Sequence, residues 1–233
     1  MATLQKLFGD TVGRLIFKHV TIARITALTP HFRRLELQGE VGAPKAGDKV
    51  QVALDAGLRT YTPFGFAPAA KTVQLLAWLH GETTPGARWA SSARVGDQVS
   101  FFGPRRSLPL EALSGTVVLF GDESSFAVAR ALADTGRSTV RPIFEVADAG
   151  ESGAVLDALG LQPRELVERR PGRAHLAAVV EQLGAALGAG PAQLVLTGNA
   201  GSIQAVRAQL KQAGVTAKQL NKAYWAEGKR GLD

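Results

Sequence analysis

The 233-residue sequence contains no cysteine, and this absence excludes several kinds of chemistry. Without thiolates there is no disulfide, no cysteine nucleophile and no cysteine-ligated iron–sulfur cluster. Redox chemistry would therefore need a bound organic cofactor or a metal held by other ligands. The histidines have no pair at metal-ligand spacing, so we expect no metal site. They are His19, His31, His80 and His175.

Long apolar runs and aromatic side chains are also scarce. No run approaches the roughly 18 apolar residues of a membrane-spanning helix, and the first residues lack the layout of a secretory signal. We therefore expect no membrane span and a cytoplasmic location. The oligomeric state stays open, with a monomer favoured. Aromatic residues make up 6% of the chain, without a zinc-finger or RNA-binding signature. The net charge of +7 then favours a dinucleotide or an acidic small molecule over nucleic acid.

Two patterns of hydrophobicity divide the chain. Between Leu15 and Phe102, short alternating segments separated by turns predict strands. These are expected near 15–25, 32–37, 49–54, 72–79 and 97–102, with one helix over 86–94. After Gly103–Pro104 and a linker near 107–109, apolar strands alternate with helices, which favours a parallel sheet. We expect strands at 116–120, 139–146 and 193–198, and helices at 124–132, 175–187 and 202–213.

The segment Arg59-Thr60-Tyr61-Thr62-Pro63-Phe64 is the first candidate for function. Side chains in a strand alternate between its faces, so a cation, a ring and a hydroxyl would be presented together. A guanidinium for a pyrophosphate, an aromatic plane and a hydroxyl are the contacts that a flavin dinucleotide needs. The alternative is an ordinary strand with an exposed Arg and a half-buried Tyr.

Two strand ends in the second half are further candidates. Ligands of open parallel sheets bind at the carboxyl ends of the strands. Those ends are Gly121-Asp122-Glu123-Ser124 and Thr197-Gly198-Asn199-Ala200, and neither contains a Gly-x-Gly-x-x-Gly fingerprint. Each turn is equally consistent with a plain strand-to-helix connection and its N-cap.

Five short motifs in a fixed order resemble the siderophore-interacting protein family, the ferric-siderophore reductases of the ferredoxin-reductase superfamily. The motifs span roughly residues 14–228. They are Arg59-Thr60-Tyr61-Thr62, His80-Gly81 before Arg88-Trp89-Ala90, Gly96-Asp97 before Gly103-Pro104-Arg105, Gly121-Asp122-Glu123-Ser124 and Tyr224-Trp225. The resemblance implies an antiparallel Greek-key β-barrel that binds FAD, over residues 14–106. An α/β domain with a parallel sheet that binds NAD(P)H would follow, over residues 113–233.

The resemblance also implies roles for individual residues. Arg59 would bind the pyrophosphate, Tyr61 would stack on the flavin, and Thr62 would bond near its reactive nitrogen as the catalytic residue. His80, Gly81, Pro85, Gly86, Ala87 and Trp89 would close over the pyrophosphate and adenosine. Gly121, Asp122, Glu123, Ser124, Gly198 and Asn199 would face NAD(P)H. The activity implied is electron transfer from NAD(P)H through FAD to the Fe(III) of a siderophore.

Basic residues near the end of the chain are candidates for binding an anionic ferric siderophore. They are Lys218, Lys222, Lys229 and Arg230, although a solvated helix face and tail would look the same. The basic run Arg164, Arg169, Arg170 and Arg173 is expected to be a surface loop.

Two departures from the family pattern bear on flavin affinity. Phe64 stands where the family usually has a second Arg, and Ala87 where it usually has Ser or Thr. Two alternatives therefore remain open: a general NAD(P)H-flavin or ferredoxin-type reductase, and a non-catalytic binder that has lost tight flavin affinity. The siderophore class and the choice between NADH, NADPH and another donor also stay open.

Overall fold

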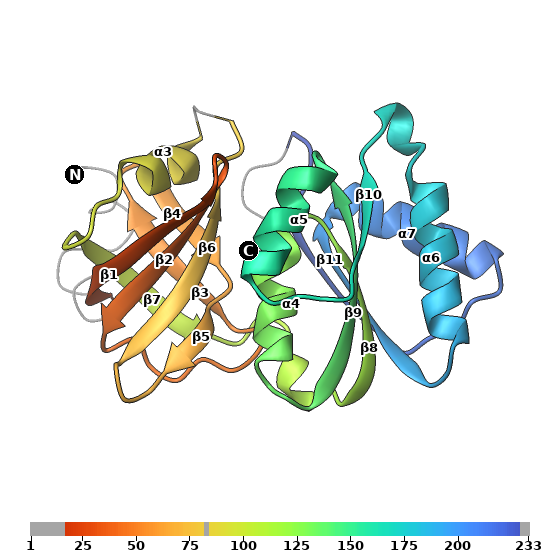
Figure 1. The fold of residues 1–233 in the computed structure, drawn as a ribbon, viewed down its shortest axis with the longest axis horizontal. Coiled ribbons are helices and arrows are strands. Elements are labelled where there is room, and N and C mark those ends of the chain that lie inside the picture. Colours follow the sequence, from red (N-terminus) through yellow and green to blue (C-terminus); the bar gives the residue numbers. More distant parts are fainter. Residues whose placement is uncertain (1–16, 82–83, 229–233) are drawn as a thin grey trace. The chain divides into compact units, whose positions relative to one another are not determined.

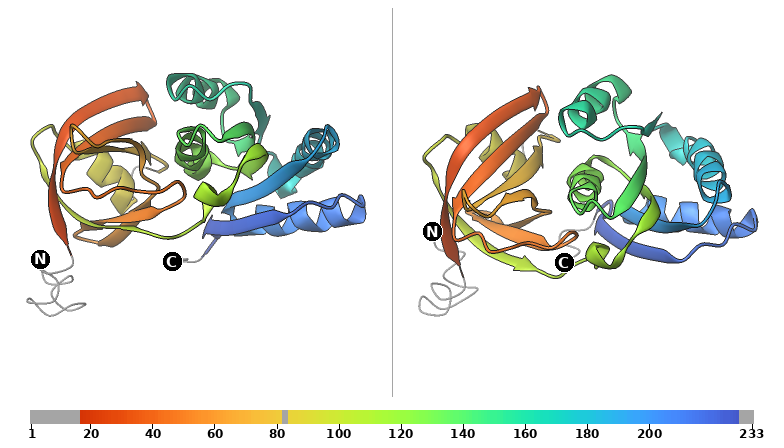
Figure 2. Two further views of the ribbon diagram at one scale, coloured as in Figure 1. Left: turned by 90° about the horizontal axis from the view of Figure 1, so that it is seen from below. Right: turned by 60° about the horizontal axis from the view of Figure 1, so that its bottom comes forward.

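The computed structural model describes residues 17–81 and 84–228, and the chain divides into one unit ending at Leu110 and another beginning at Glu111. In the first unit, a seven-stranded antiparallel sheet curls around a core, and helix α3 lies across one end of the curled sheet (Figures 1 and 2). Its elements are β1 (Lys18–Thr29), β2 (Phe32–Gly39), β3 (Lys49–Leu54), β4 (Gly57–Tyr61), β5 (Phe64–Ala67), β6 (Thr72–Trp78), α3 (Pro85–Ser92) and β7 (Gln98–Arg105).

A two-residue connection forces this sheet to close. The strand order is β4-β3-β7-β1-β2-β6-β5, so β4 and β5 are the two edges. Only Thr62 and Pro63 separate the end of β4 at Tyr61 from the start of β5 at Phe64. Three Cα–Cα steps of 3.8 Å span at most about 11 Å, so the edges must approach each other and the sheet becomes a barrel. Proline lacks an N–H group for strand pairing and suits this junction.

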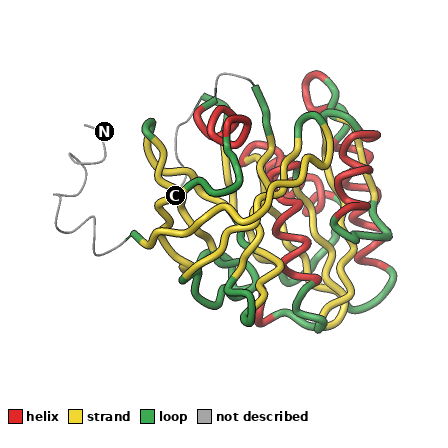
Figure 3. The backbone as a smooth tube through the Cα atoms, turned by 60° about the vertical axis from the view of Figure 1, so that its left-hand side comes forward, coloured by secondary structure: helices red, strands yellow, loops and turns green. Residues whose placement is uncertain are grey.

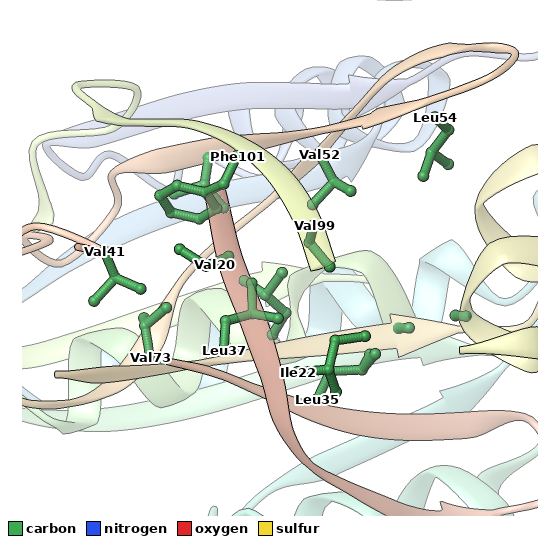
Figure 4. Packing of buried hydrophobic residues seen from close by; sticks show 14 residues of the cluster. Val20, Ile22, Leu35, Leu37, Val41, Val52, Leu54, Val73, Val99 and Phe101 are labelled. Carbon is green, nitrogen blue, oxygen red and sulfur yellow. The ribbon is translucent and has the colours of Figure 1, made fainter. Parts of the chain in front are cut away.

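The barrel core follows from strand alternation. Aliphatic residues at alternate positions of the central strands point inward and are almost completely buried, and in β3 and β6 some of the residues between them are buried as well. Figure 4 shows how these aliphatic side chains and Phe101 pack together. The core includes Val20, Ile22, Leu35, Leu37, Val50, Val52, Val73, Leu75, Val99 and Phe101.

The second unit is a five-stranded parallel sheet in the order β10-β9-β8-β11-β12. Helices α4 and α5 cover one face and α6 and α7 cover the other (Figure 1); in Figure 3 the helices are red and the strands yellow. The elements are β8 (Gly115–Gly121), α4 (Phe126–Ala133), β9 (Ser138–Val146), α5 (Ala149–Ala158), β10 (Glu165–Glu168), α6 (Leu176–Gly188), β11 (Ala192–Asn199), α7 (Ala200–Gln212) and β12 (Gln219–Trp225). Among the described residues, no helix has the length and apolar content to cross a membrane.

The order of the sheet reverses between β8 and β11. From β8 the chain continues through α4 on one face, and from β11 it continues through α7 on the opposite face. The connections that leave the carboxyl ends of these two strands therefore diverge, which is the arrangement that forms a ligand-binding crevice in open parallel sheets. The antiparallel barrel and the parallel α/β sheet predicted from the sequence are both confirmed.

Asp122 ties the strands together at this crevice. Its side chain is 0% exposed. Its carboxylate accepts hydrogen bonds from the Asn199 N–H at 2.9 Å, the Trp225 Nε1–H at 2.7 Å, the Ser124 N–H at 2.9 Å and the Ser124 hydroxyl. The ends of β8, β11 and β12 are thus fastened by one carboxylate. A Cβ at Gly198 would lie 2.5 Å from Asp122 Oδ2, so this close approach requires glycine.

We predict that Asp122 makes the stability of the second unit depend on pH. Burial raises the pKa of its carboxyl from 3.8 to about 6, although bonds from Ser124 and Trp225 oppose the rise. Because the folded protein then holds the proton more tightly than the unfolded chain, the stabilising contribution of Asp122 is largest below about pH 4 and declines as pH rises through about 6. The full shift corresponds to about 3 kcal/mol.

Urea unfolding of the wild type and Asp122→Asn at several pH values measures this effect. Asparagine does not ionise, so the stability of the variant relative to wild type should increase by up to about 3 kcal/mol between about pH 4 and pH 7. Asparagine also has one hydrogen-bond acceptor oxygen fewer than aspartate, and this loss changes the free energy of unfolding by an amount that does not depend on pH. A constant difference across this range would show that Asp122 titrates at its ordinary value.

Candidate functional site

Arg59 and Tyr61 project from the same face of β4 toward the start of α3. A Cβ at Gly86 would lie 3.5 Å from the Tyr61 hydroxyl oxygen and 3.8 Å from Arg59 Cγ. Thr60, between them, accepts a hydrogen bond from Gln51 Nε2 at 3.4 Å. The alternation expected from the sequence therefore brings the aliphatic stem of Arg59 and the phenol of Tyr61 together beside Gly86, while Arg59 Nη1 donates a hydrogen bond to the Leu58 carbonyl oxygen at 2.7 Å.

Helix α3 presents its amino end to these two side chains. Thr84 caps the helix by accepting a hydrogen bond from the Ala87 N–H at 3.4 Å, and Pro85 occupies its first turn without an N–H group. Among the described residues, the Gly86 N–H has no hydrogen-bond partner. An amide at a helix amino end, close to the stem of an arginine side chain, suits a phosphate group.

The ring of Tyr61 is half-buried against the barrel core and Trp89. The two ring centroids are 5.9 Å apart and tilted by 53°. Burial raises the pKa of the Tyr61 hydroxyl above its usual value, although the charge of Arg59 opposes the rise. The phenol therefore stays protonated at neutral pH and remains able to donate a hydrogen bond.

His80 and Gly81 lie in the segment that leads into α3. The Thr84 hydroxyl is 3.3 Å from the carbonyl oxygens of both His80 and Gly81. His80 is exposed, and its imidazole packs 4.7 Å from the ring of Trp78. Thr84 was missed as a site residue from the sequence, although threonine before Pro-Gly is a recognisable helix start.

The two positions at which the sequence departs from the family that it resembles, Phe64 and Ala87, are both buried. Phe64 is 4% exposed, and Ala87 on α3 is also buried. Phe64 therefore packs inside the protein, where an uncompensated charge would be costly. Thr62 lies outside the strand ladders, in the connection between β4 and β5, and is partly exposed.

In the second unit, the predicted residues after β8 are largely engaged with the protein itself. Glu123 is buried and accepts two hydrogen bonds from Arg169, at 2.6 and 2.7 Å, and one from the Ala147 N–H at 2.7 Å. A Cβ at Gly121 would lie 2.4 Å from the side chain of Ser125. These residues shape the carboxyl edge of the sheet, and their polar atoms are committed to holding it together.

A cavity of about 340 Å³ opens at this edge. Its walls come from the end of β9, the segment after β10, the start of α7 and the end of β12. The lining residues are Glu145, Arg169, Arg170, Gly172, Arg173, His175, Asn199, Ser202, Trp225 and Glu227. Of the six residues predicted to face a nicotinamide nucleotide, only Asn199 lines the cavity. Asn199 also caps α7 by accepting a hydrogen bond from the Ser202 N–H at 3.0 Å.

Three arginines give the cavity its cationic wall. Arg169 is held by Glu123, and Arg173 lies 3.2 Å from exposed Glu227. The Arg170 side chain has no hydrogen bond or ion pair with a described residue. These arginines lie in a largely exposed loop after β10, as the sequence predicted, and this loop borders the cavity at the carboxyl edge of the sheet. Arg164 instead pairs with Asp157 at 2.6 Å.

His175 fixes the backbone of this arginine segment. The imidazole is buried, and its Nδ1 accepts a hydrogen bond from the Arg170 N–H at 3.1 Å. An accepting Nδ1 carries no proton, so Nε2 carries it and donates to Glu145 Oε2 at 2.7 Å. His175 and the arginines were missed as site residues because only the parallel sheet brings them beside α7.

The structure says little about the basic residues that were predicted to bind a siderophore. Lys222 lies on β12 opposite Thr197 of β11 and does not line the cavity. Lys229 and Arg230 lie outside the described residues. Within residues 17–81 and 84–228, no group of three or more metal-ligating His, Cys, Asp or Glu side chains comes together.

The comparisons with known proteins agree with this geometry. Residues 42–108, which include Arg59, Tyr61 and α3, match the family described as the siderophore-interacting FAD-binding domain. No curated protein matches the sequence significantly.

Solved structures share the two-part fold. A siderophore utilization protein from T. fusca is 20% identical with a TM-score of 0.67, covering 93% of this chain and 95% of its own. The siderophore-interacting protein SipS from Aeromonas hydrophila is 18% identical with a TM-score of 0.69, covering 92% and 93%. A ferredoxin NADP+ reductase from Neisseria gonorrhoeae, solved with bound FAD and NADP, is 18% identical with a TM-score of 0.69, covering 90% and 99%. Residues 42–108 therefore match the siderophore-interacting FAD-binding domain, and the chain has the two-part fold seen in siderophore-interacting proteins and in a ferredoxin reductase.

Proposed function

We propose that this protein is an FAD-dependent reductase that passes electrons from NAD(P)H to the Fe(III) of a siderophore. The observation that carries the proposal is the convergence of Arg59, Tyr61 and the Gly86 backbone within the matched FAD-binding domain. Reduction would release the iron, because hard oxygen ligands hold Fe(III) far better than Fe(II).

The side chains of the barrel suit the parts of FAD. Arg59 would pair with the pyrophosphate, and the Gly86 N–H would donate a hydrogen bond to it. Tyr61 would pack against the cofactor with its protonated hydroxyl as a donor, while Thr62 would offer a hydroxyl at the junction of β4 and β5. FAD itself, when bound, accepts a hydride and donates single electrons.

The cavity of the second unit suits the phosphates of NAD(P)H. Arg170 and Arg173 would bind phosphate oxygens, and the amino end of α7 adds partial positive charge beside them. Asp122, Glu123 and His175 would act indirectly, because their hydrogen bonds fix the walls of the cavity. Lys222, Lys229 and Arg230 remain our candidates for attracting an anionic siderophore.

We predict that Arg59→Gln weakens FAD binding. Losing a charge-assisted bond to the pyrophosphate should raise the Kd by roughly ten- to a hundredfold. Arg24→Gln is the matched control, because Arg24 is an exposed arginine on β1 and its replacement removes the same charge. Quenching of flavin fluorescence on titration measures both values. Equal loss in the two variants would point to a general charge effect.

We predict that Arg170→Gln weakens NADPH binding to the FAD-loaded protein by about tenfold while leaving the melting temperature unchanged. The side chain of Arg170 bonds no described residue, so its removal should cost little stability. Arg207→Gln, on the exposed side of α7, is the control. An unchanged Kd for NADPH would place the nucleotide elsewhere.

The activity is tested by following ferrous iron, trapped by a chelator, with FAD-loaded protein, NAD(P)H and a ferric siderophore without oxygen. We expect ferrous iron to form faster from the siderophore than from a soluble ferric salt. Equal rates would favour the general flavin reductase. Failure of wild-type protein to retain flavin absorbance or gain thermal stability with FAD would favour the non-catalytic binder, because a ligand at 100 times its Kd stabilises by about 2.7 kcal/mol.

A further inference from the structure

Helix α3 is held to the barrel by few interactions of its own. It has eight residues, which makes it about 12 Å long, and its fully buried side chains are only Ala87 and Ala90. Trp89 is partly buried against the core. No basic residue lies in the last turn of α3 to offset the negative end of its dipole. The helix therefore depends on another element to fix its carboxyl end.

Arg33, on β2, provides that support. Its guanidinium Nη1 donates hydrogen bonds to the Ala90 carbonyl oxygen at 2.9 Å and the Ser91 carbonyl oxygen at 2.7 Å. The carbonyls of Arg88 and Trp89 are served locally, because the Ser92 hydroxyl bonds to both oxygens and the Ala93 N–H donates to the Trp89 oxygen. Arg33 thus supplies the charge and the donors that α3 lacks.

The strand that carries Arg33 is a firm support. β2 lies inside the sheet, paired with β1 on one side and with β6 on the other. Arg33 pairs in register with Ala27 and Ala77, and its neighbours Phe32 and Leu35 are buried in the barrel. A guanidinium anchored on this strand therefore ties α3 to an internal strand of the barrel wall.

We infer that Arg33 is a positioning residue for FAD, holding the carboxyl end of α3 so that Gly86 at its amino end stays beside Arg59 and Tyr61. A helix this short moves as a rigid rod, so freeing one end displaces the other. Arg33 itself would not touch the cofactor. The inference rests on the proposed FAD site, and Arg33 lies outside the residues 42–108 that match the FAD-binding domain.

Three variants test this role. Arg33→Met keeps an apolar stem and removes the donors, Arg33→Lys keeps a charge and part of the donor set, and Arg34→Met changes the next residue of β2 as a control. The Kd values for FAD and for riboflavin, which lacks phosphates and adenosine, are measured by quenching of flavin fluorescence. The melting temperature of each cofactor-free protein is recorded.

We expect Arg33→Met to raise the Kd for FAD by about tenfold and to leave the Kd for riboflavin unchanged, because α3 meets the phosphate part of the cofactor. Arg33→Lys should recover part of the affinity, and Arg34→Met should bind as wild type does. If Arg33→Met does not fold, the Kd values of Arg33→Lys for FAD and for riboflavin are compared instead, and only the Kd for FAD should rise.

Two results would overturn the role of Arg33. One is an FAD Kd within about twofold of wild type in Arg33→Met. The other is an equal loss of FAD and riboflavin binding, which would mean that Arg33 only stabilises the barrel. Failure of the wild-type protein to bind FAD would instead contradict the proposed function, so the two failures are distinguishable.

Discussion

The connection of two residues between β4 and β5 is the constraint on which the first unit depends. Because Thr62 and Pro63 must join the two edges of the sheet, the barrel closes at the point where Arg59 and Tyr61 end their strand. Closure fixes these side chains on one side of β4, where α3 packs and brings its amino end to them. The same short connection thus shapes the fold and assembles a set of groups suited to a flavin dinucleotide.

A buried carboxylate has the corresponding role in the second unit. Parallel strands leave their carboxyl ends open, and Asp122 joins three of them through hydrogen bonds from Asn199, Trp225 and Ser124. Because its carboxylate oxygens accept these hydrogen bonds, Asp122 stabilises the carboxyl edge of the sheet. The cationic groups that face the adjacent cavity come from the segment after β10, which Glu123 and His175 hold in place. The cationic residues that face the cavity are therefore different from the residues whose hydrogen bonds shape its walls.

Much of the fold could be predicted from the sequence, because strand alternation and the later alternation of strands with helices are strong local signals. The elements that were missed carry weak signals: β5 and β10 have four residues each, β12 mixes polar and apolar side chains, and α5 has no clear apolar stripe. The hexamer around Arg59 could be recognised because its residues are contiguous. The link from Arg33 to α3 spans 57 residues, and Arg170 lines the same cavity as the start of α7 only because the sheet brings the two segments together. Such contacts follow from topology and leave no local pattern.

The central claim is that a flavin dinucleotide binds where the barrel closes, with its phosphates between Arg59 and the start of α3. A crystal structure of the protein with FAD tests this claim most directly. The account predicts the pyrophosphate within hydrogen-bonding distance of the Arg59 guanidinium and the Gly86 N–H, and the isoalloxazine against Tyr61. A structure with FAD bound at another surface, or with that side of β4 filled by the protein's own side chains, would contradict it.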